Sequence, residues 1–228
     1  MDLKFLGCGD CCSYELGNNA AYWKDGENLF FLDMGESIFA KALHENILEG
    51  VKDVTIFITH CHADHMASLG EALTFFAFLQ KEITFRIVFP EPEILKSYLR
   101  GAYILEGIPF IGETEGIVNG VRFEAKIAKH IPHSYCYFFE KNGERIHYSG
   151  DNAEIHPQAL EELQNGKLSR MYLDVAPKQS PFHLGLSSGE DKIPLELRDK
   201  VILMHLESLA FAEEIEKRGF DSALKHRI

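Results

Sequence analysis

Four side chains of metal-binding types fall within six residues, directly after the apolar run 54–59: His60, His62, Asp64 and His65. In an extended chain the side chains alternate between two faces, so His60 and His62 point the same way and can hold one ion. Asp64 and His65 follow at the turn into the next helix and can reach a second ion. Two ions about 3.5–4 Å apart activate a water between them and stabilise the charge that develops in a displacement reaction. The segment predicts a hydrolytic metal centre, and the alternative is a chance cluster of polar residues.

Three more residues of metal-binding types come later, each where an apolar run ends: His130, Asp151 and His205. Asp151 belongs to a Ser-Gly-Asp triplet, and Asp33 lies upstream in an Asp-x-Gly turn. In type and order, these residues resemble the metallo-β-lactamase superfamily, over residues 3 to about 211. The resemblance implies that Asp33 supports the metal loop without binding metal.

The same resemblance implies two sets of ligands that share one residue. The ligands of one ion would be His60, His62 and His130. The ligands of the other ion would be Asp64, His65 and His205. Asp151 would bridge the two ions, and a hydroxide between them would be the nucleophile, because two cations bring the pKa of bound water toward neutrality. Asp64 and Asp151 are thus assigned to catalysis as well as to metal binding. Zinc is the metal that such ligands favour, with manganese or iron as alternatives.

The apolar runs predict an α/β protein, a four-layer αββα sandwich with two mixed β-sheets, in a single domain over 1–228 because no linker or repeat divides the chain. Strands are expected at 2–7, 20–24, 28–33, 54–59, 84–89, 121–128, 134–140, 145–149, 170–175 and 201–205. Helices are expected at 37–48, 66–80, 92–100, 156–165 and 207–218. Asn142-Gly143 predicts a hairpin turn. The expected helix 66–80 is apolar almost all round, which predicts burial in the core or, alternatively, a homodimer contact.

The residues after His130 narrow the branch of the superfamily. Thioesterase and lactamase branches place a Thr-x-Gly turn after the third histidine ligand, which this chain lacks. The Cys136-Tyr137 pair instead lies where ribonuclease Z and cyclic-phosphate phosphodiesterases have Gly-Tyr, with cysteine replacing glycine. This register favours His130 as the third ligand over its rival His133. His133 would then line the pocket and contact a phosphate oxygen or a leaving group, or else lie on the strand surface.

His183 falls where ribonuclease Z relatives carry a loop histidine that assists the leaving group. Asp174 ends the preceding expected strand and can orient His183, as an acid does in those relatives. The residues around His183 match the ribonuclease Z pattern poorly, so the alternative is that His183 and Asp174 take no part in catalysis.

Charge and chain length weigh against a folded RNA substrate. The net charge is −12, which repels a polyanion at long range. Between Tyr137 and Asp151 there is room only for a hairpin, without a basic arm to hold tRNA. A small phosphodiester or nucleotide is therefore the expected substrate, with an RNA-processing nuclease of ribonuclease Z type or a thioester or lactone hydrolase as alternatives. An iron oxidoreductase would carry Glu in place of His62 and a flavin domain, and a non-catalytic binding protein would have lost ligands.

Five cysteines, an odd number, favour a reducing compartment over a disulfide framework. Cys8, Cys11 and Cys12 cluster after the first expected strand, as spectator thiols or, alternatively, for redox sensing or metal contact. Cys61 and Cys136 are expected to pack as small apolar groups. The chain start resembles no signal peptide and no run approaches 18 apolar residues, so a cytoplasmic protein that does not enter a membrane is expected.

Overall fold

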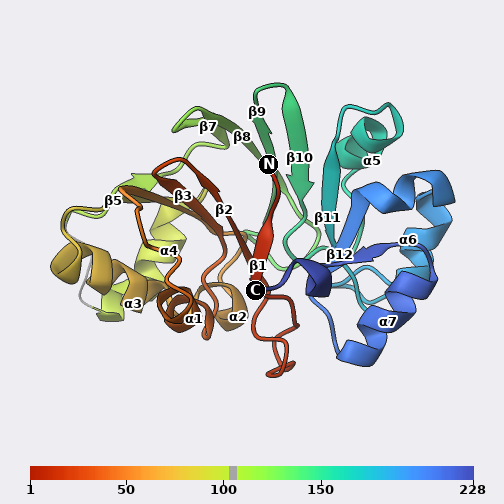
Figure 1. Cartoon of the computed structure of the whole chain (residues 1–228), viewed down its shortest axis with the longest axis horizontal. Helices are drawn as coiled ribbons and strands as arrows, with labels where there is room; N and C mark the ends of the chain where they lie inside the picture. The colour runs from red at the N-terminus through yellow and green to blue at the C-terminus, as the bar shows by residue number, and fades with distance from the viewer. Residues whose placement is uncertain (103–106) are drawn as a thin grey trace.

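Two mixed β-sheets face each other in the computed structural model, which describes residues 1–102 and 107–228 (Figure 1). The first sheet has the strand order β1-β2-β3-β4-β5-β6. Its strands are β1 (Lys4–Gly7), β2 (Ala20–Asp25), β3 (Asn28–Leu32), β4 (Asp53–Phe57), β5 (Thr84–Val88) and β6 (Phe110–Ile111). β1, β2 and β3 are antiparallel neighbours, whereas β3 to β6 run parallel.

The second sheet has the strand order β13-β12-β11-β10-β9-β8-β7. Its strands are β7 (Glu115–Val118), β8 (Val121–Ile127), β9 (Tyr135–Lys141), β10 (Glu144–Tyr148), β11 (Arg170–Asp174), β12 (Val201–Met204) and β13 (Asp221–Ser222). β7 to β10 are antiparallel, and β10 to β13 run parallel. The β9–β10 turn is Asn142-Gly143, and both residues have positive φ, as the expected hairpin requires.

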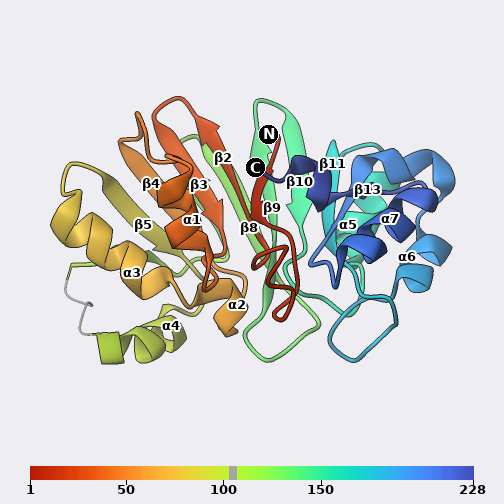
Figure 2. The ribbon, with the colours of Figure 1, turned by 60° about the horizontal axis from the view of Figure 1, so that its bottom comes forward.

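Helices lie on the outer side of each sheet (Figure 2). The α-helices are α1 (Ile38–His44), α2 (Ala63–Met66), α3 (Leu69–Thr74), α4 (Pro92–Leu99), α5 (Pro157–Gln164), α6 (Leu186–Lys192) and α7 (Leu209–Lys217). A π-helix, η1 (Phe75–Leu79), continues α3, and short 3₁₀ turns are η2 (Arg100–Ala102), η3 (Leu195–Lys200) and η4 (Ala223–His226). The predicted αββα sandwich is confirmed. None of the helices in the described ranges has the length and apolar character that crossing a bilayer needs.

Aromatic side chains fill the space between the two sheets. The ring centroid of Phe57, from β4, lies 4.8 Å from that of Phe139 and 5.4 Å from that of Tyr137. Both partner rings come from β9 and meet Phe57 edge to face. Polar ties cross the same interface, because Tyr137 Oη donates to Ile58 O at 2.8 Å and Asn19 Nδ2 donates to Tyr148 Oη at 3.0 Å. Every buried hydroxyl in this group thus has a partner, as burial of polar groups demands.

Strand direction decides where the candidate ligands emerge. β4 runs parallel to β3, and β8, β10 and β12 run parallel to one another in the second sheet. Their carboxyl ends deliver, in chain order, His60, His130, Asp151 and His205. The loops after β1 and β11 emerge at the same edge in Figure 2. The expected ligands therefore converge because four separate strands end on one edge of the sandwich.

Several expected elements differ from the structure. The expected helix 66–80 begins at Ala63 and is divided into α2, α3 and η1, with Ser68 at the junction donating from Oγ to Gly35 O at 2.6 Å. This run is not buried throughout, since Phe78 is 61% and Leu79 72% exposed. Strands β6, β7 and β13 and helix α6 were not expected at all. The first three are short, and α6 contains Gly189, a poor helix former.

Candidate metal centre

The motif segment follows β4 in an extended conformation and then turns into α2. His62 is the N-cap of α2, with φ −68° and ψ 150°, so the chain is still extended at this point. Asp64 and His65 lie within the first turn of α2 and are buried. They are therefore helical residues, not turn residues as expected. The short helix aims both side chains at the same centre as His60.

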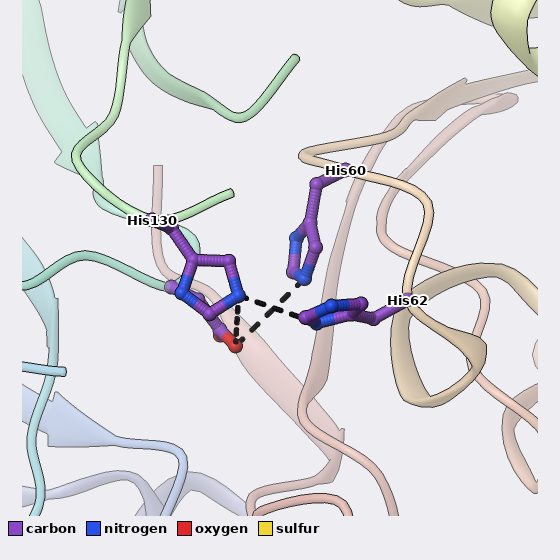
Figure 3. Close-up of side chains that lie close together, drawn as sticks. His60, His62 and His130 are labelled. Carbon is purple, nitrogen blue, oxygen red and sulfur yellow. Dashed lines mark hydrogen bonds and ion pairs between the residues drawn. The ribbon is translucent and has the colours of Figure 1, made fainter. Parts of the chain in front are cut away.

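One group of candidate ligands, here the outer group, consists of His60, His62, His130 and Asp151, whose ligand atoms lie within 4.8 Å of one another. His130 Nε2 lies 3.2 Å from His62 Nδ1 and 3.7 Å from Asp151 Oδ2 (Figure 3). His60 Nε2 lies 3.8 Å from the same Asp151 oxygen. His62 is partly exposed, so this group borders solvent. The structure thus brings together the first expected ligand set.

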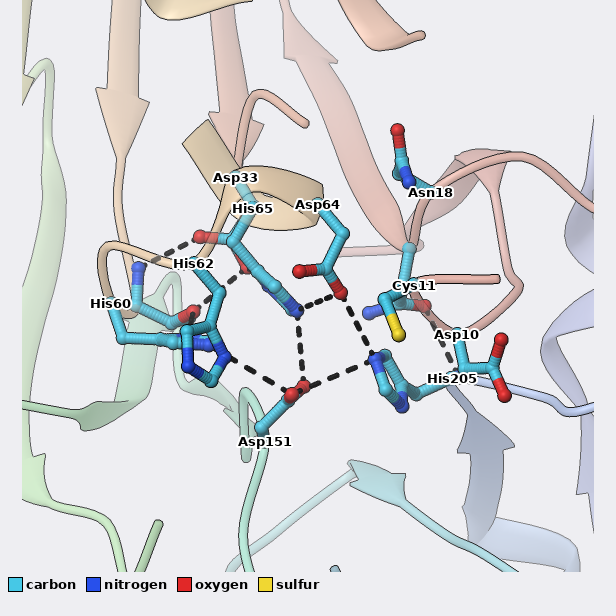
Figure 4. A network of polar contacts seen from close by, with 12 residues as sticks. Asp10, Cys11, Asn18, Asp33, His60, His62, Asp64, His65, Asp151 and His205 are labelled. Carbon is cyan, nitrogen blue, oxygen red and sulfur yellow. Dashed lines mark hydrogen bonds and ion pairs between the residues drawn. The ribbon is translucent and has the colours of Figure 1, made fainter. Parts of the chain in front are cut away.

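The second group, here the inner group, consists of Asp64, His65, Asp151 and His205, again within 4.8 Å of one another and all buried. His65 Nε2 lies 3.2 Å from Asp64 Oδ2 and 3.2 Å from Asp151 Oδ1. His205 Nε2 lies 3.5 Å from Asp64 Oδ2 and 3.5 Å from Asp151 Oδ2 (Figure 4). Asp151 belongs to both groups, at the position expected for a bridging carboxylate.

The donor atoms suit divalent cations. His60 Nε2, His65 Nε2 and Asp151 Oδ1 are buried and, within the described residues, have no hydrogen-bond partner. Buried polar atoms are rarely left in this state unless an ion or a water satisfies them. Imidazole nitrogens and carboxylate oxygens at the ends of rigid strands are ligands that zinc and related metals use. The two groups therefore fit two ions that share Asp151.

Charge in the inner group supports the same fit. Burial opposes charge on His65 and His205, yet the neighbouring carboxylates, Asp151 first, raise the pKa of both imidazoles well above its ordinary value. Burial would raise the pKa of Asp151, but the charges of His205 and His65 hold it well below its usual range. Burial lowers the pKa of His60, so that ring stays neutral. The carboxylates of the inner group thus need nearby positive charge, which metal ions supply when they displace protons from histidine ligands.

Comparison with known proteins agrees with this geometry. The family described as Anti-Pycsar protein Apyc1 matches residues 1–227. The chain belongs to the Apyc1 family. Apyc1 of Paenibacillus harenae is 25% identical over 219 residues, 90% of this chain and 89% of that protein. Ribonuclease Z of Methanocaldococcus jannaschii is 32% identical over 251 aligned residues, 99% of this chain and 76% of that protein. The metallo-β-lactamase fold protein YhfI from Bacillus subtilis superposes with a TM-score of 0.73 at 15% identity, over 96% of this chain and 93% of that one. The Apyc1-family chain thus has the metallo-β-lactamase fold that its sequence predicted.

Buried acceptors orient the candidate ligand histidines of this Apyc1-family chain. Asp33 Oδ1 accepts from Thr59 N at 2.7 Å, and its Oδ2 lies 2.9 Å from His65 Nδ1. Because a carboxylate only accepts, His65 donates from Nδ1 and turns Nε2 toward the inner group. His130 Nδ1 donates in the same way to Phe182 O at 2.9 Å, which leaves its Nε2 free for an ion.

Gly150 allows the two sheets to approach at the site. Its φ is 55°, in the left-handed region that favours glycine, and a Cβ there would lie 2.8 Å from Thr59 Cβ. Only a glycine therefore lets Asp151 reach the motif segment.

His183 and Asp174 lie beside the inner group. His183 Nδ1 donates to Asp174 Oδ2 at 2.9 Å, and Asp174 Oδ1 lies 3.4 Å from His205 Nδ1. Burial lowers the pKa of His183, but the bond to Asp174 and its charge outweigh burial and raise it. The His183 ring is stacked on the His205 ring, with the ring centroids 5.1 Å apart. Asp151, Asp174, His183 and His205 form a third group of close ligand-type atoms.

His133 belongs to none of these groups. Its Nδ1 lies 2.8 Å from Glu91 Oε1, its side chain is 47% exposed, and its backbone is left-handed with φ 65°. Tyr135 Oη also donates to Glu91. The structure therefore places the exposed His133 against Glu91, outside the ligand groups, while His130 lies among the ligand-type residues.

The cysteines are all free thiols. Cys8 and Cys136 are buried, and burial raises the pKa of Cys8 to about 11 and that of Cys136 to about 12. Cys11 and Cys12 are exposed, with their Sγ atoms 3.6 Å apart, and Cys11 lies beside Asp64 and His205 in Figure 4. None of the five belongs to a ligand group within the described residues.

Sequence reasoning missed three residues that contact the candidate ligands and fix their positions. Phe182 acts through its backbone carbonyl, so residue type gives no signal. Asn19 Oδ1 accepts from His205 N at 3.3 Å, and no motif marks it. Thr59, directly before the motif, contacts His60 Nδ1 through Oγ1 at 3.0 Å, and its place next to the first ligand was an available signal.

Proposed function

We propose that this chain is a dinuclear metal-dependent phosphodiesterase that hydrolyses a small phosphodiester or nucleotide. The observation that carries the proposal is the pair of ligand groups that share Asp151. Paired sites of this kind suit hydrolysis at phosphorus, because both the attacking and the leaving oxygen need stabilisation in an in-line displacement. Zinc is the first choice of metal, with manganese or iron as alternatives.

When bound, the two ions would lower the pKa of a water and stabilise negative charge on the phosphate. Asp151 would fix the spacing of the two positions, and Asp64 would complete the inner one. His60, His62 and His130 would hold the outer ion, and His65 and His205 would hold the inner ion. Asp33 and the Phe182 carbonyl keep those rings in the orientation that binding needs.

His183 would donate a proton to the leaving oxygen. Its Nδ1–H is held by Asp174, so its Nε2 is the atom that can carry and release a proton. His183 is stacked on His205 and lies 5.2 Å from the His130 ring, between the inner and outer groups. A histidine oriented by a buried carboxylate is the arrangement that proton transfer to an alkoxide requires.

Charge favours a small substrate. The net charge of −12 opposes long-range attraction of a polyanion, and the β9–β10 connection is a two-residue turn. An RNA-processing nuclease is the second candidate, supported by the 32% identity to a ribonuclease Z over 99% of this chain. A small diester carries about one charge, so its turnover should depend much less on salt than cleavage of an RNA held by many phosphate contacts.

The test is one metal-loaded preparation assayed on bis(p-nitrophenyl) phosphate, a thioester, a lactone and a pre-tRNA at two salt concentrations. We expect dominant, weakly salt-dependent turnover of the phosphodiester. Dominant thioester or lactone turnover would overturn the assignment to phosphorus chemistry. Efficient, strongly salt-dependent cleavage of the pre-tRNA would instead establish the second candidate.

A further inference from the structure

The loop between β11 and α6, residues 175–185, contacts both ligand groups through two neighbouring residues. Phe182 O accepts from His130 Nδ1 at 2.9 Å, on the side of the outer group. His183 Nδ1 donates to Asp174 Oδ2 at 2.9 Å, on the side of the inner group. Because Phe182 and His183 are adjacent in the chain, a shift of the 175–185 loop would disturb an outer candidate ligand and the proposed proton donor together.

The tip of the 175–185 loop is not held by burial. Phe182 is 48% exposed, and residues 177–179 are exposed. Segments that bury little apolar surface open easily unless hydrogen bonds fix them. The position of the tip therefore depends on the hydrogen bonds that the loop makes.

The side chain of Gln179 makes most of the side-chain hydrogen bonds that span the loop. Its Nε2 lies 2.9 Å from Ala153 O, 3.0 Å from Ser180 O and 3.2 Å from His183 O. Its Oε1 accepts from Gly185 N at 2.9 Å. An amide has two N–H donors and one carbonyl acceptor, so this side chain uses its full hydrogen-bonding capacity within reach of the loop. One residue thus joins the tip of the loop to its end.

The backbone around Gln179 is closely packed. A Cβ on Gly185 would lie 2.4 Å from Gln179 N, so only a glycine allows this approach. Ser180 Oγ accepts from Phe182 N at 3.1 Å and from His183 N at 2.9 Å, and Ser180 N donates to His183 O at 3.1 Å. The tip is therefore a closed turn that moves as a unit.

The bond from Gln179 to Ala153 ties this turn to the segments that carry two candidate ligands. Ala153 lies two residues after Asp151, and its N–H donates to Lys129 O at 2.8 Å. Lys129 directly precedes His130. The three segments that carry Asp151, His130 and His183 are thus connected through Ala153, and Gln179 supplies the connection from the third.

We propose that Gln179 is a positioning residue that holds Phe182 O against His130 and His183 against Asp174 at the same time. It acts through these two residues and not by contact with the reacting atoms. The part that concerns proton donation rests on the proposed function. The part that concerns metal retention rests on the ligand geometry alone. Loss of Gln179 should therefore weaken the outer ion and the proton donor together.

Metal release tests the first consequence without any substrate. Gln179→Ala is compared with the unaltered protein and with Gln158→Ala, the matched control, because Gln158 Nε2 donates to Glu162 within α5. During timed dialysis of the metal-loaded proteins against a weak chelator, elemental analysis should show one ion lost about tenfold faster in Gln179→Ala. The other ion should leave at the normal rate, and circular dichroism should show an unchanged fold.

Two diesters test the second consequence at saturating metal. The nitrophenolate that leaves bis(p-nitrophenyl) phosphate is stable without a proton, whereas the sugar alkoxide that leaves from a cyclic mononucleotide needs one. For Gln179→Ala we expect kcat to fall about tenfold or more on the cyclic mononucleotide but less than about threefold on bis(p-nitrophenyl) phosphate. KM should change less than about twofold on either diester, because Gln179 acts on a step after binding.

Gln179→Glu keeps the Oε1 acceptor but removes the Nε2 donors, so it should repeat the pattern of Gln179→Ala. If Gln179→Ala does not fold, Ser180→Ala, which removes the acceptor of Phe182 N and His183 N, should show the same pattern. Equal rates of ion loss in Gln179→Ala and Gln158→Ala, or equal losses of kcat on the two diesters, would overturn the joint positioning. If the unaltered protein hydrolyses neither diester, the proposed function fails, and the rates of ion loss alone decide whether Gln179 holds the outer group.

Discussion

The outer and inner groups share Asp151 but differ in what surrounds them. The outer group has the partly exposed His62 and a backbone carbonyl behind His130. The inner group is buried, and its histidines are backed by the carboxylates of Asp33 and Asp174. Carboxylates behind a histidine raise its basicity as a ligand more than a neutral carbonyl does. The inner position should therefore bind its ion more tightly than the outer position does. The outer position, which borders solvent, should release its ion more readily and should be where substrate enters.

The largest effect is expected from Asp151→Ala, which removes the one residue common to both groups. We expect hydrolysis to fall by at least about 100-fold, because a shared carboxylate positions both ions. The fold should persist, so the circular dichroism spectrum of the variant should match that of the unaltered protein. Metal content should fall at both positions by elemental analysis. Retention of a tenth or more of the activity would show that Asp151 does not bridge.

A pair of ligand variants tests the difference between the groups directly. The chain should bind two ions, and a weak chelator should remove them in two steps, with the outer ion lost first. His62→Ala should leave one ion that resists the chelator, whereas Asp64→Asn should leave ions that are lost easily. Elemental analysis after timed dialysis measures both. One ion or fewer in the reconstituted unaltered protein, or identical release from the two variants, would contradict the comparison.

The two groups also differ in how far sequence could predict them. Residues 60–65 are contiguous, so local alternation of side chains alone indicated a metal site. His130 and His205 lie 65 and 140 residues after the end of that segment and became candidates only through the order of residues shared with a family. Strand direction then explained their convergence. The Phe182 carbonyl and the Asn19 amide could not be predicted, because their roles depend on tertiary position and not on residue type.

Secondary structure shows the same limit. The turn signal Asn-Gly occurs at 142–143 and again at 119–120, and positive φ values mark both turns. A hairpin is predicted from the sequence only at the first; β7, before the second, contains Gly116 and lacks a clear apolar alternation. The break in the expected helix 66–80 depends on Ser68, whose bond to Gly35 O joins segments that are distant in sequence. Contacts of this kind override local helix propensity.

A smaller effect should separate His130 from His133. His130→Asn should lower metal occupancy at the outer position, since His130 Nε2 faces His62 and Asp151. His133→Asn should leave occupancy unchanged and alter turnover or KM at most modestly, because His133 contacts Glu91 instead. Asparagine tolerates the left-handed backbone at His133, so the variants are matched. Normal occupancy in His130→Asn with loss in His133→Asn would move the ligand to His133.

His147, on β10, is a histidine without the carboxylates that surround the metal centre. It is fully buried against Phe138, with ring centroids 4.7 Å apart, and within the described residues neither ring nitrogen has a hydrogen-bond partner. Burial, reinforced by the charges of His156 and Arg145, lowers its pKa to about 3. The ring therefore stays neutral in the folded protein at pH values where it would be charged in the unfolded chain.

The low pKa of His147 predicts how the stability of the metal-free protein changes as pH falls. Between the unfolded pKa of about 6.5 and the folded pKa, the unfolded chain binds a proton at His147 that the folded chain does not. His147 should therefore lower the free energy of unfolding by up to about 1.4 kcal/mol per pH unit as pH falls from 6.5 toward 3. Above pH 6.5 its contribution is constant. His147→Phe and His147→Leu should both flatten this slope in urea unfolding of metal-free protein, whatever their effect at pH 7. If the free energy of unfolding depends on pH in the same way in both variants as in the unaltered protein, His147 does not cause the acid sensitivity. The residues of the metal centre would then be its source.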